Sequence, residues 1–339
     1  MQTSDFDFHL PRAQVAQQPA EPRDAARLMV LRRSVLTVEH RLFSDLPSLL
    51  DAGDLLVVND TRVMAARLFG HRPDTGGRVE ALLVRPFTSR RWEVLFRPAR
   101  QAMVGRSFVF EATDGALGGT VVARETGSVT LEFDREFDPA AVGAVPLPPY
   151  IKAYQGDPER YQTIYAREPR SAAAPTAGLH FTPSLFESLA AKGIERAAVT
   201  LEVGPGTFKP VDVDDPRDYA LHAEHVTVPT ETASRISATQ ADGGRIVAVG
   251  TTVVRTLEHV AREHGVVEGY EGWTSLKILP GDLFSVTDVL ITNFHLPRST
   301  LLMLVCALAG QEFVLDAYRL AVEDGYRFYS FGDAMLILP

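Results

Sequence analysis

Two histidines stand in short runs of small and polar residues that could support proton transfer. His180 lies near the end of residues 174–181 (APTAGLHF), and His295 lies within residues 290–300 (LITNFHLPRST). Imidazole exchanges a proton near neutral pH, so each histidine is a candidate acid or base. For His180 the alternative is a loop histidine that bonds to the backbone. For His295 we favour a functional role, because Asn-Phe-His at a strand end has no obvious packing purpose.

Two further loops could hold a ligand where a strand meets polar residues. Residues 201–209 (LEVGPGTFK) follow an apolar strand, but Lys209 replaces the third glycine of the dinucleotide-binding fingerprint. Residues 248–255 (AVGTTVVR) run from a strand into a helix, whose free N–H groups favour anionic or carbonyl ligands. Plain capping of that helix by Thr251 would explain the same residues equally well. The candidate ligand-binding residues in these loops and the two histidine loops are Thr176, Gly178, Phe181, Glu202, Gly204, Gly206, Thr207, Phe208, Gly250, Thr251, Thr252, Arg255, Asn293 and Phe294.

A few polar residues outside these four loops are also candidates. Asn59, Thr61 and Arg62 follow an apolar strand, and Asp333 lies in a polar turn near the C-terminus. His222 and Glu224 would share one face if their segment is extended. Together with His225 they match no zinc-binding spacing, so we predict no metal site.

A cluster of arginines could contact nucleic acid. The segment from Arg62 to Arg106 holds ten arginines and three acidic residues, whereas the whole chain has a net charge of −9. The arginine fork suits phosphate, so the cluster could be an RNA-binding surface on an acidic protein. Outward-facing arginines on solvated strands are an equally good explanation. The candidate tRNA-binding residues are Arg85, Arg90, Arg91, Arg97 and Arg100.

The secondary-structure elements that must position these residues follow two different patterns along the chain. Strands are predicted at residues 27–31, 54–59, 196–201, 245–249 and 288–291, and helices at 182–192, 230–241, 252–264 and after Ser299. This alternation predicts an α/β fold with a mixed, largely parallel sheet flanked by helices. Between them, short strands near residues 78–85, 91–96, 107–110, 119–123 and 128–133 predict an inserted all-β, barrel-like domain. We expect residues 1–66 and 146–339 to form the α/β domain and residues 67–145 the inserted barrel.

The composition is that of an ordinary globular chain. Its 339 residues are 45% hydrophobic, enough for a large core without crosslinks. The single cysteine, Cys306, lies in an apolar run and is expected to be a buried thiol. That run is too short to span a bilayer, and residues 1–10 lack the apolar core of a signal peptide. We therefore expect a cytoplasmic protein with no membrane association.

Taken together and in order, the motifs resemble those of the S-adenosylmethionine:tRNA ribosyltransferase-isomerase family of queuosine biosynthesis. The resemblance runs from about residue 5 to residue 338 and is weakest through the β-rich insertion. Its most specific motifs are APTAGLHF and TNFHLP. The others are DFDFHLP (5–11), PRDAARL (22–28), DLLVVNDTR (54–62), ARL (66–68), PLPPYI (146–151), YQTIY (161–165), GPGTF (204–208), HAE (222–224), VGTTVVR (249–255) and YRFYSFGDAM (326–335).

The resemblance implies an activity, a set of substrates and roles for the candidate residues. Such enzymes transfer and isomerise the ribosyl group of S-adenosylmethionine to 7-aminomethyl-7-deazaguanine at the wobble position of tRNAs with GUN anticodons. The products are epoxyqueuosine in tRNA, adenine and methionine; S-adenosylmethionine is a co-substrate, with no permanently bound cofactor, and the protein is expected to be a monomer. His180 and His295 would be the base and the acid, in either order, and Glu202 or Glu224 would face the sulfonium. Thr251, Thr252 and Arg255 would hold the methionine carboxylate or a tRNA phosphate, and Phe181, Phe208 or Phe294 would stack on a base, although isolated aromatic residues are more often part of the core.

Two rival functions remain to be weighed. An S-adenosylmethionine-dependent RNA methyltransferase would carry its Gly-x-Gly loop early in the α/β domain, with an acid on the next strand for the ribose. Here the loop comes after residue 200, and no acid follows at that spacing. A non-catalytic RNA-binding protein would need the arginine cluster but no site for S-adenosylmethionine.

Overall fold

The computed structural model describes residues 1–113, 115–204 and 211–339 and divides into two compact units. The α/β unit comprises Met1–Arg62, Pro149–Glu168 and Ala174–Pro339. The barrel unit comprises Val63–Pro148 and Pro169–Ala173, so the chain enters and leaves it twice.

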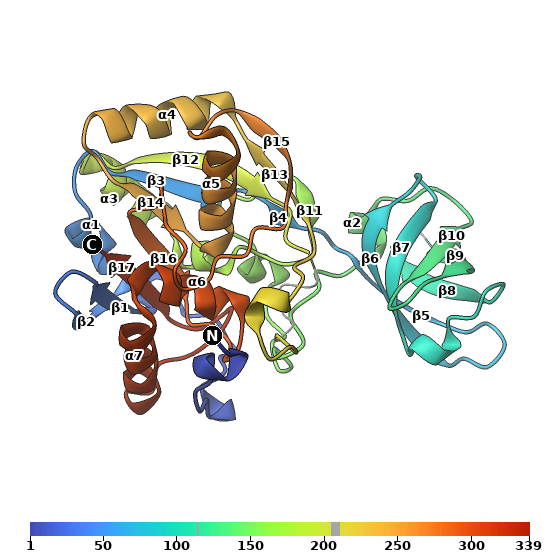
Figure 1. Cartoon of the computed structure of the whole chain (residues 1–339). Helices are drawn as coiled ribbons and strands as arrows, with labels where there is room; N and C mark the ends of the chain where they lie inside the picture. The colour runs from blue at the N-terminus through green and yellow to red at the C-terminus, as the bar shows by residue number, and fades with distance from the viewer. Residues whose placement is uncertain (114, 205–210) are drawn as a thin grey trace. The chain divides into compact units, whose positions relative to one another are not determined.

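A nine-stranded mixed sheet forms the centre of the α/β unit, in the order β15-β13-β12-β3-β14-β16-β17-β1-β2 (Figure 1). The pairs β12-β3, β3-β14, β14-β16 and β17-β1 are parallel, and the other neighbours are antiparallel. Because β12, β3, β14 and β16 run in the same direction, their carboxyl ends meet at one edge of the sheet. The strands are β1 (Arg27–Arg32), β2 (Thr37–Leu42), β3 (Leu55–Asn59), β12 (Glu195–Leu201), β13 (Glu224–Val228), β14 (Ile246–Val249), β15 (Tyr270–Thr274), β16 (Val289–Asn293) and β17 (Ala334–Leu338).

Helices cover both faces of this sheet because its central strands are apolar on both sides. In β1, Met29 and Leu31 pack into one core, whereas Leu28 and Val30 pack into the other, as the alternation of a strand requires. The first core contains residues of α4 (Thr230–Ala241), α5 (Thr251–His264), α6 (Thr300–Ala309) and α7 (Gln311–Glu323). The second contains residues that flank or form α1 (Leu46–Leu49) and α3 (Pro183–Ala191). The predicted α/β fold class is confirmed.

The apolar helix α6 belongs to the first core. Its predicted cap is confirmed: the Ser299 hydroxyl accepts a hydrogen bond from the Leu302 N–H at 3.2 Å. Cys306 is buried as expected, and burial raises the pKa of its thiol to about 12. No single helix in the described ranges is long and apolar enough to cross a membrane; only α6 and α7 taken together reach such a length, and they are bent by 116°.

Six antiparallel strands of the barrel unit close into a barrel, in the order β10-β7-β6-β5-β8-β9. The expected barrel-like insertion is thus confirmed, with one strand, β5, that the sequence did not reveal. Gly70 on β5 allows a close approach, because a Cβ there would lie 2.5 Å from the Val109 carbonyl oxygen. The strands are β5 (Arg67–His71), β6 (Arg78–Pro86), β7 (Arg91–Arg97), β8 (Ser107–Ala112), β9 (Gly115–Arg124) and β10 (Val129–Phe133). The short elements α2 (Pro139–Val142), β4 (Arg62–Val63) and β11 (Pro169–Ser171) complete the described α-helices and β-strands, and short 3-10 helices lie between them.

A buried carboxylate fixes α5 against the segment that leads into β16. Glu258 on α5 is fully buried, and its two oxygens accept hydrogen bonds from the backbone N–H groups of residues 285–287 at 2.9–3.1 Å. The Ser285 hydroxyl adds a fourth bond at 3.0 Å. A buried carboxylate is tolerated only when its acceptor sites are occupied in this way. Glu258 thus joins α5, which begins with Thr251 and Thr252 at the carboxyl edge of the sheet, to the segment before β16, which ends at that edge with Asn293.

We predict that Glu258→Gln destabilises the protein by about 3 kcal/mol, because a neutral amide replaces one acceptor with donors that face backbone N–H groups. Chemical denaturation of the variant and the wild type measures the difference. Glu263→Gln is the matched control, since Glu263 lies on the same helix with its side chain 49% exposed; a change of less than about 0.5 kcal/mol is expected there. Equal stabilities of Glu258→Gln and wild type would contradict this account of the clamp.

Candidate active site

Asn59 ends β3 and joins three elements at the sheet edge. Its Nδ2 donates to the Leu201 carbonyl oxygen at 3.1 Å and to Thr252 Oγ1 at 3.3 Å. Its Oδ1 accepts from the backbone N–H groups of Leu201 and Thr61, both at 3.1 Å. The side chain is fully buried and has used its two donors and two acceptor positions. Asn59 therefore organises the edge instead of offering its amide to a ligand.

The residues that follow Asn59 are also held by the protein. Asp60 accepts a hydrogen bond from the Thr200 hydroxyl at 2.6 Å and lies 3.5 Å from Arg167. Thr61 is buried, with 1% of its surface exposed. Arg62 is partly exposed and pairs with Glu159.

The loop between β14 and α5 is a tight turn beside Asn59. Gly250 has φ +95°, a left-handed conformation that only glycine adopts at little cost, and its N–H donates to the Ile291 carbonyl at 2.8 Å. Gly250 is the N-cap of α5, and no side chain caps this helix. The alternative that Thr251 is a plain capping residue is therefore wrong, because Thr251 is already the first helical residue. Thr251 is buried, and Thr252 is engaged by Asn59.

A buried ion pair lies one turn further along α5. Arg255 Nη1 bonds to Glu224 Oε2, and each residue is only 7% exposed. Glu224 Oε1 accepts from the Gly204 N–H at 3.0 Å, and Arg255 Nε donates to the Leu276 carbonyl at 2.9 Å. The Nη2 of Arg255 is buried and, among the residues the structure describes, has no hydrogen-bond partner. The charge of Glu224 is thus compensated within the protein, and Arg255 retains one donor for a ligand.

Of the other candidate residues in and around the Gly-x-Gly loop, the structure describes some and not others. Glu202 Oε1 lies 3.6 Å from His225 Nδ1, and the Glu202 side chain is 26% exposed. His222 is exposed in the loop before β13, whereas Glu224 is buried, so the two do not form the expected pair. Gly206, Thr207 and Phe208 lie outside the described residues. Within the ranges that are described, no group of three or more His, Cys, Asp or Glu residues could hold a metal ion.

His180 ends the 3-10 helix η7 (Thr176–His180) and is bound to the backbone at both ring nitrogens. Nδ1 lies 3.2 Å from the Ala177 carbonyl oxygen and Nε2 lies 3.0 Å from that of Gly332. The ring stacks on Phe43 at 5.0 Å and is 4% exposed, and burial lowers its pKa. A neutral imidazole donates from only one nitrogen, so the ring donates to only one of these two carbonyls. The contacts are those of the backbone-bonded alternative.

Gly178 in the same turn is required by packing. A Cβ at this position would lie 2.0 Å from the Tyr165 hydroxyl oxygen. Its absence of a side chain is thus explained without a ligand.

A short chain of hydrogen bonds connects η7 with the end of β16. Thr176 Oγ1 donates to Asn293 Oδ1 at 2.8 Å, and Asn293 Nδ2 donates to the Tyr329 carbonyl at 3.2 Å. His295 follows, with Nε2 2.8 Å from Thr292 Oγ1. Burial lowers the pKa of His295 to about 3, so its ring is neutral at neutral pH, and the residue remains partly exposed. His295 is therefore the more accessible of the two histidines.

Three candidates belong to the core instead of a ligand site. Phe181 stacks on Phe186 at 4.8 Å, Phe294 lies among Tyr318, Tyr326 and Phe328, and both phenylalanines are fully buried. A base therefore has no access to either ring, and the expectation of stacking on Phe181 or Phe294 is corrected. Asp333 accepts from the backbone N–H groups of Arg27 and Arg327 and pairs with the Arg327 guanidinium, so its contacts are structural.

The candidate arginines on the barrel are all exposed. Two are paired on the strands: Arg85 lies 3.2 Å from Glu93, and Arg91 lies 3.1 Å from Glu132. Arg90 donates to the Phe133 carbonyl at 3.0 Å. Within the described ranges, Arg97 and Arg100 form no ion pair.

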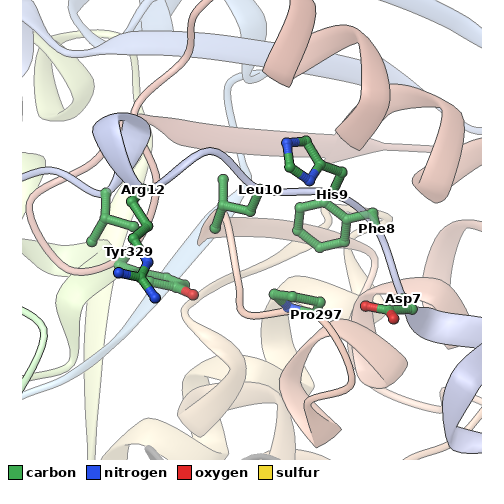
Figure 2. Close-up of a pocket in the computed structure, with 8 residues that line it drawn as sticks. Asp7, Phe8, His9, Leu10, Arg12, Pro297 and Tyr329 are labelled. Carbon is green, nitrogen blue, oxygen red and sulfur yellow. The ribbon is translucent and has the colours of Figure 1, made fainter.

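The fold also creates a cavity that no sequence motif predicted (Figure 2). This cavity of about 650 Å³ is lined by the N-terminal segment, Pro297 and Tyr329. The motifs at residues 5–11 and 326–335 were noted in the sequence, but only the tertiary structure brings them together.

Comparisons with known proteins agree with one another. The chain matches the family described as queuosine biosynthesis protein over residues 3–337. The S-adenosylmethionine:tRNA ribosyltransferase-isomerases of Symbiobacterium thermophilum and Moorella thermoacetica are 54% and 53% identical to it, each over the full length of both chains. The crystal structure of the S-adenosylmethionine tRNA ribosyltransferase from Thermotoga maritima is 40% identical, has a TM-score of 0.59 and covers 99% of this chain and 100% of its own. The chain therefore belongs to the S-adenosylmethionine:tRNA ribosyltransferase-isomerase family of queuosine biosynthesis.

Proposed function

We propose that this protein transfers and isomerises the ribosyl group of S-adenosylmethionine to 7-aminomethyl-7-deazaguanine at the wobble position of tRNAs with GUN anticodons. The products are epoxyqueuosine in tRNA, adenine and methionine. The observation that carries the proposal is the identity of 54% over the full length of a relative that bears this enzyme name. At that similarity the site is expected to serve the same reaction.

We place S-adenosylmethionine at the sheet edge where β3, β14 and β16 end. Ligands of α/β proteins bind outside the carboxyl ends of parallel strands, where the loops are not hydrogen-bonded into the sheet and can contact a ligand. The unpaired Nη2 of Arg255 and the uncapped start of α5 suit the methionine carboxylate. Glu224 is poorly suited to face the sulfonium, because Arg255 already neutralises it.

The reaction needs a base that removes a C5′ proton and an acid that protonates the departing adenine. Burial lowers the pKa of His295 to about 3, so the ring is neutral at neutral pH and begins as a proton acceptor, but as a weaker one than an exposed imidazole. After it has taken the C5′ proton, the same imidazolium can protonate adenine. A single histidine would then serve both steps, with His180 holding the loop around it.

We predict that His295→Asn lowers the rate of adenine release by about 10²- to 10⁴-fold, the usual loss for a general acid–base group. The affinity for S-adenosylmethionine, measured by calorimetry, should change little. His180→Ala should lower the melting temperature as well as the rate, because the buried backbone carbonyl that accepts the ring N–H loses its donor. His264→Ala, on the surface end of α5, is the control and should retain activity. Full turnover in both the His295 and the His180 variants would exclude these residues from proton transfer.

We propose that the exposed arginines of the barrel bind the tRNA backbone. Arg97 and Arg100 have no acidic partner among the described residues, and the acids that pair with Arg85 and Arg91 are partly exposed. Solvent-exposed pairs of this kind are weak, so phosphate oxygens can replace the carboxylates. Each phosphate contact releases counterions, which makes the affinity fall as salt rises.

Changing Arg90, Arg97 and Arg100 together to Glu should weaken tRNA binding and flatten its dependence on salt by about one unit of slope per lost contact. Filter binding or fluorescence anisotropy over a range of salt concentrations measures both. Arg319→Glu, a single charge reversal on the exposed surface of α7 in the other unit, is the control and should leave the slope unchanged. A slope that stays at the wild-type value would exclude the barrel as a tRNA-binding surface.

The proposed reaction is tested by incubating the protein with S-adenosylmethionine and tRNA that carries 7-aminomethyl-7-deazaguanine. Mass spectrometry should detect free adenine and epoxyqueuosine in the digested tRNA. S-adenosylhomocysteine with methylated RNA would instead indicate a methyltransferase, and RNA binding without turnover would indicate a non-catalytic protein. The names of the relatives give no support to either rival.

A further inference from the structure

A cavity of the α/β unit lies outside the polar network of the sheet edge (Figure 2). It measures about 650 Å³, within the range of small-molecule sites. We call it the Phe8–Tyr329 pocket. Its lining residues are Asp7, Phe8, His9, Leu10, Arg12, Val15, Pro297 and Tyr329.

The pocket presents aromatic rings that the surrounding structure holds in place. The ring of Phe8 packs edge-on against Tyr318, with centroids 5.2 Å apart. The ring of Tyr329 packs against Tyr150 at 4.7 Å. Both rings are only partly buried, so each retains surface toward the pocket. Rings fixed in this way can stack on a flat ligand without losing further side-chain freedom.

The rim of the pocket carries one cationic side chain, Arg12, that has no partner among the described residues. Arg12 is exposed, and within the described ranges its guanidinium has neither a hydrogen bond nor an ion pair. The one acid in the lining, Asp7, is already paired with Arg298. The unpaired charge at the rim is therefore positive, which suits a phosphate group.

The pocket adjoins the residues proposed for catalysis. Pro297 lies two residues after His295, and the Tyr329 carbonyl accepts the hydrogen bond from Asn293 at 3.2 Å. Tyr329 and Arg298 have φ values of 71° and 55°, which are strained for residues other than glycine. Strain of this kind persists where the surrounding contacts enforce it, commonly at ligand sites. An occupant of the pocket would therefore lie next to the reacting groups.

We propose that the Phe8–Tyr329 pocket binds one unpaired nucleotide of the substrate tRNA, the neighbour of the base that accepts the ribosyl group. The base stacks on Phe8 and Tyr329, and the phosphate of that nucleotide meets Arg12. Aromatic faces combined with an unpaired cation are the usual recognition elements for single-stranded RNA. The adenosyl group of S-adenosylmethionine fits less well, because it has no phosphate for Arg12. This assignment rests on the proposed function in that the tRNA is the acceptor.

Two double-mutant cycles test the proposal with a synthetic anticodon hairpin that carries guanine at the wobble position. In the first cycle, each nucleotide next to the wobble base is made abasic in turn. The intact and abasic hairpins are then compared in the wild type and in Phe8→Leu. Loss of the base should weaken wild-type binding by about 5- to 150-fold, the range for one base–aromatic stack. In Phe8→Leu the same change should have a much smaller effect. In the second cycle, an uncharged methylphosphonate replaces the phosphate, and Arg12→Ala should abolish its effect.

The controls separate this site from general effects on folding and on charge. Arg41→Ala, an exposed arginine of β2 paired with Glu39, should leave all hairpin affinities unchanged. Additive effects in both cycles would overturn the assignment. So would a loss of S-adenosylmethionine affinity, measured by calorimetry, in Arg12→Ala with unchanged hairpin binding, because the pocket would then hold the adenosyl group. Coupled cycles in a wild-type protein that releases no adenine would support the pocket and refute the proposed reaction.

Discussion

The hydrogen-bonded amide of Asn59 is the constraint on which the sheet edge depends. A strand end in a parallel sheet leaves backbone groups without a ladder partner, and in a buried position these groups must be satisfied. Asn59 satisfies the backbone of Leu201 and Thr61 and also holds Thr252 at the start of α5. Two neighbouring strands and one helix are thereby fixed to a single side chain.

Helix α5 is fixed further by its own buried charges. Arg255 binds Glu224 at the start of β13, and Glu258 binds the backbone before β16. A buried charge is tolerated only with partners, so these two residues restrict the helix to one position. The uncapped N-terminus of α5 is consequently held rigidly beside the ends of β3 and β14, as a site for an anionic group requires.

Sequence patterns predicted the elements whose periodicity is undisturbed. Helix α4 was predicted with the bounds that the structure shows, and α3, α5, β12 and β16 were placed to within a few residues. Apolar residues recur in them with the period of the element, and a glycine follows each of the three helices, at positions 193, 243 and 265. Strand β5 was not predicted, because Gly70 interrupts its apolar pattern. The expected stacking of a base on Phe181 or Phe294 was wrong, because a sequence does not show whether an aromatic ring faces solvent.

The sequence by itself determined the family, the mixed α/β fold with its inserted barrel, and the loops that carry polar residues. These follow from local order and spacing, which the sequence displays directly. Only the tertiary structure decided that Glu224 is neutralised by Arg255, that His180 is bound to two carbonyls, and that residues 7–15 meet Pro297 and Tyr329 around one cavity. The physical reason is that burial and pairing depend on residues from different elements, such as Glu224 and Arg255, which are 31 positions apart, and His180 and Gly332, which are 152 apart, and no local pattern encodes these contacts.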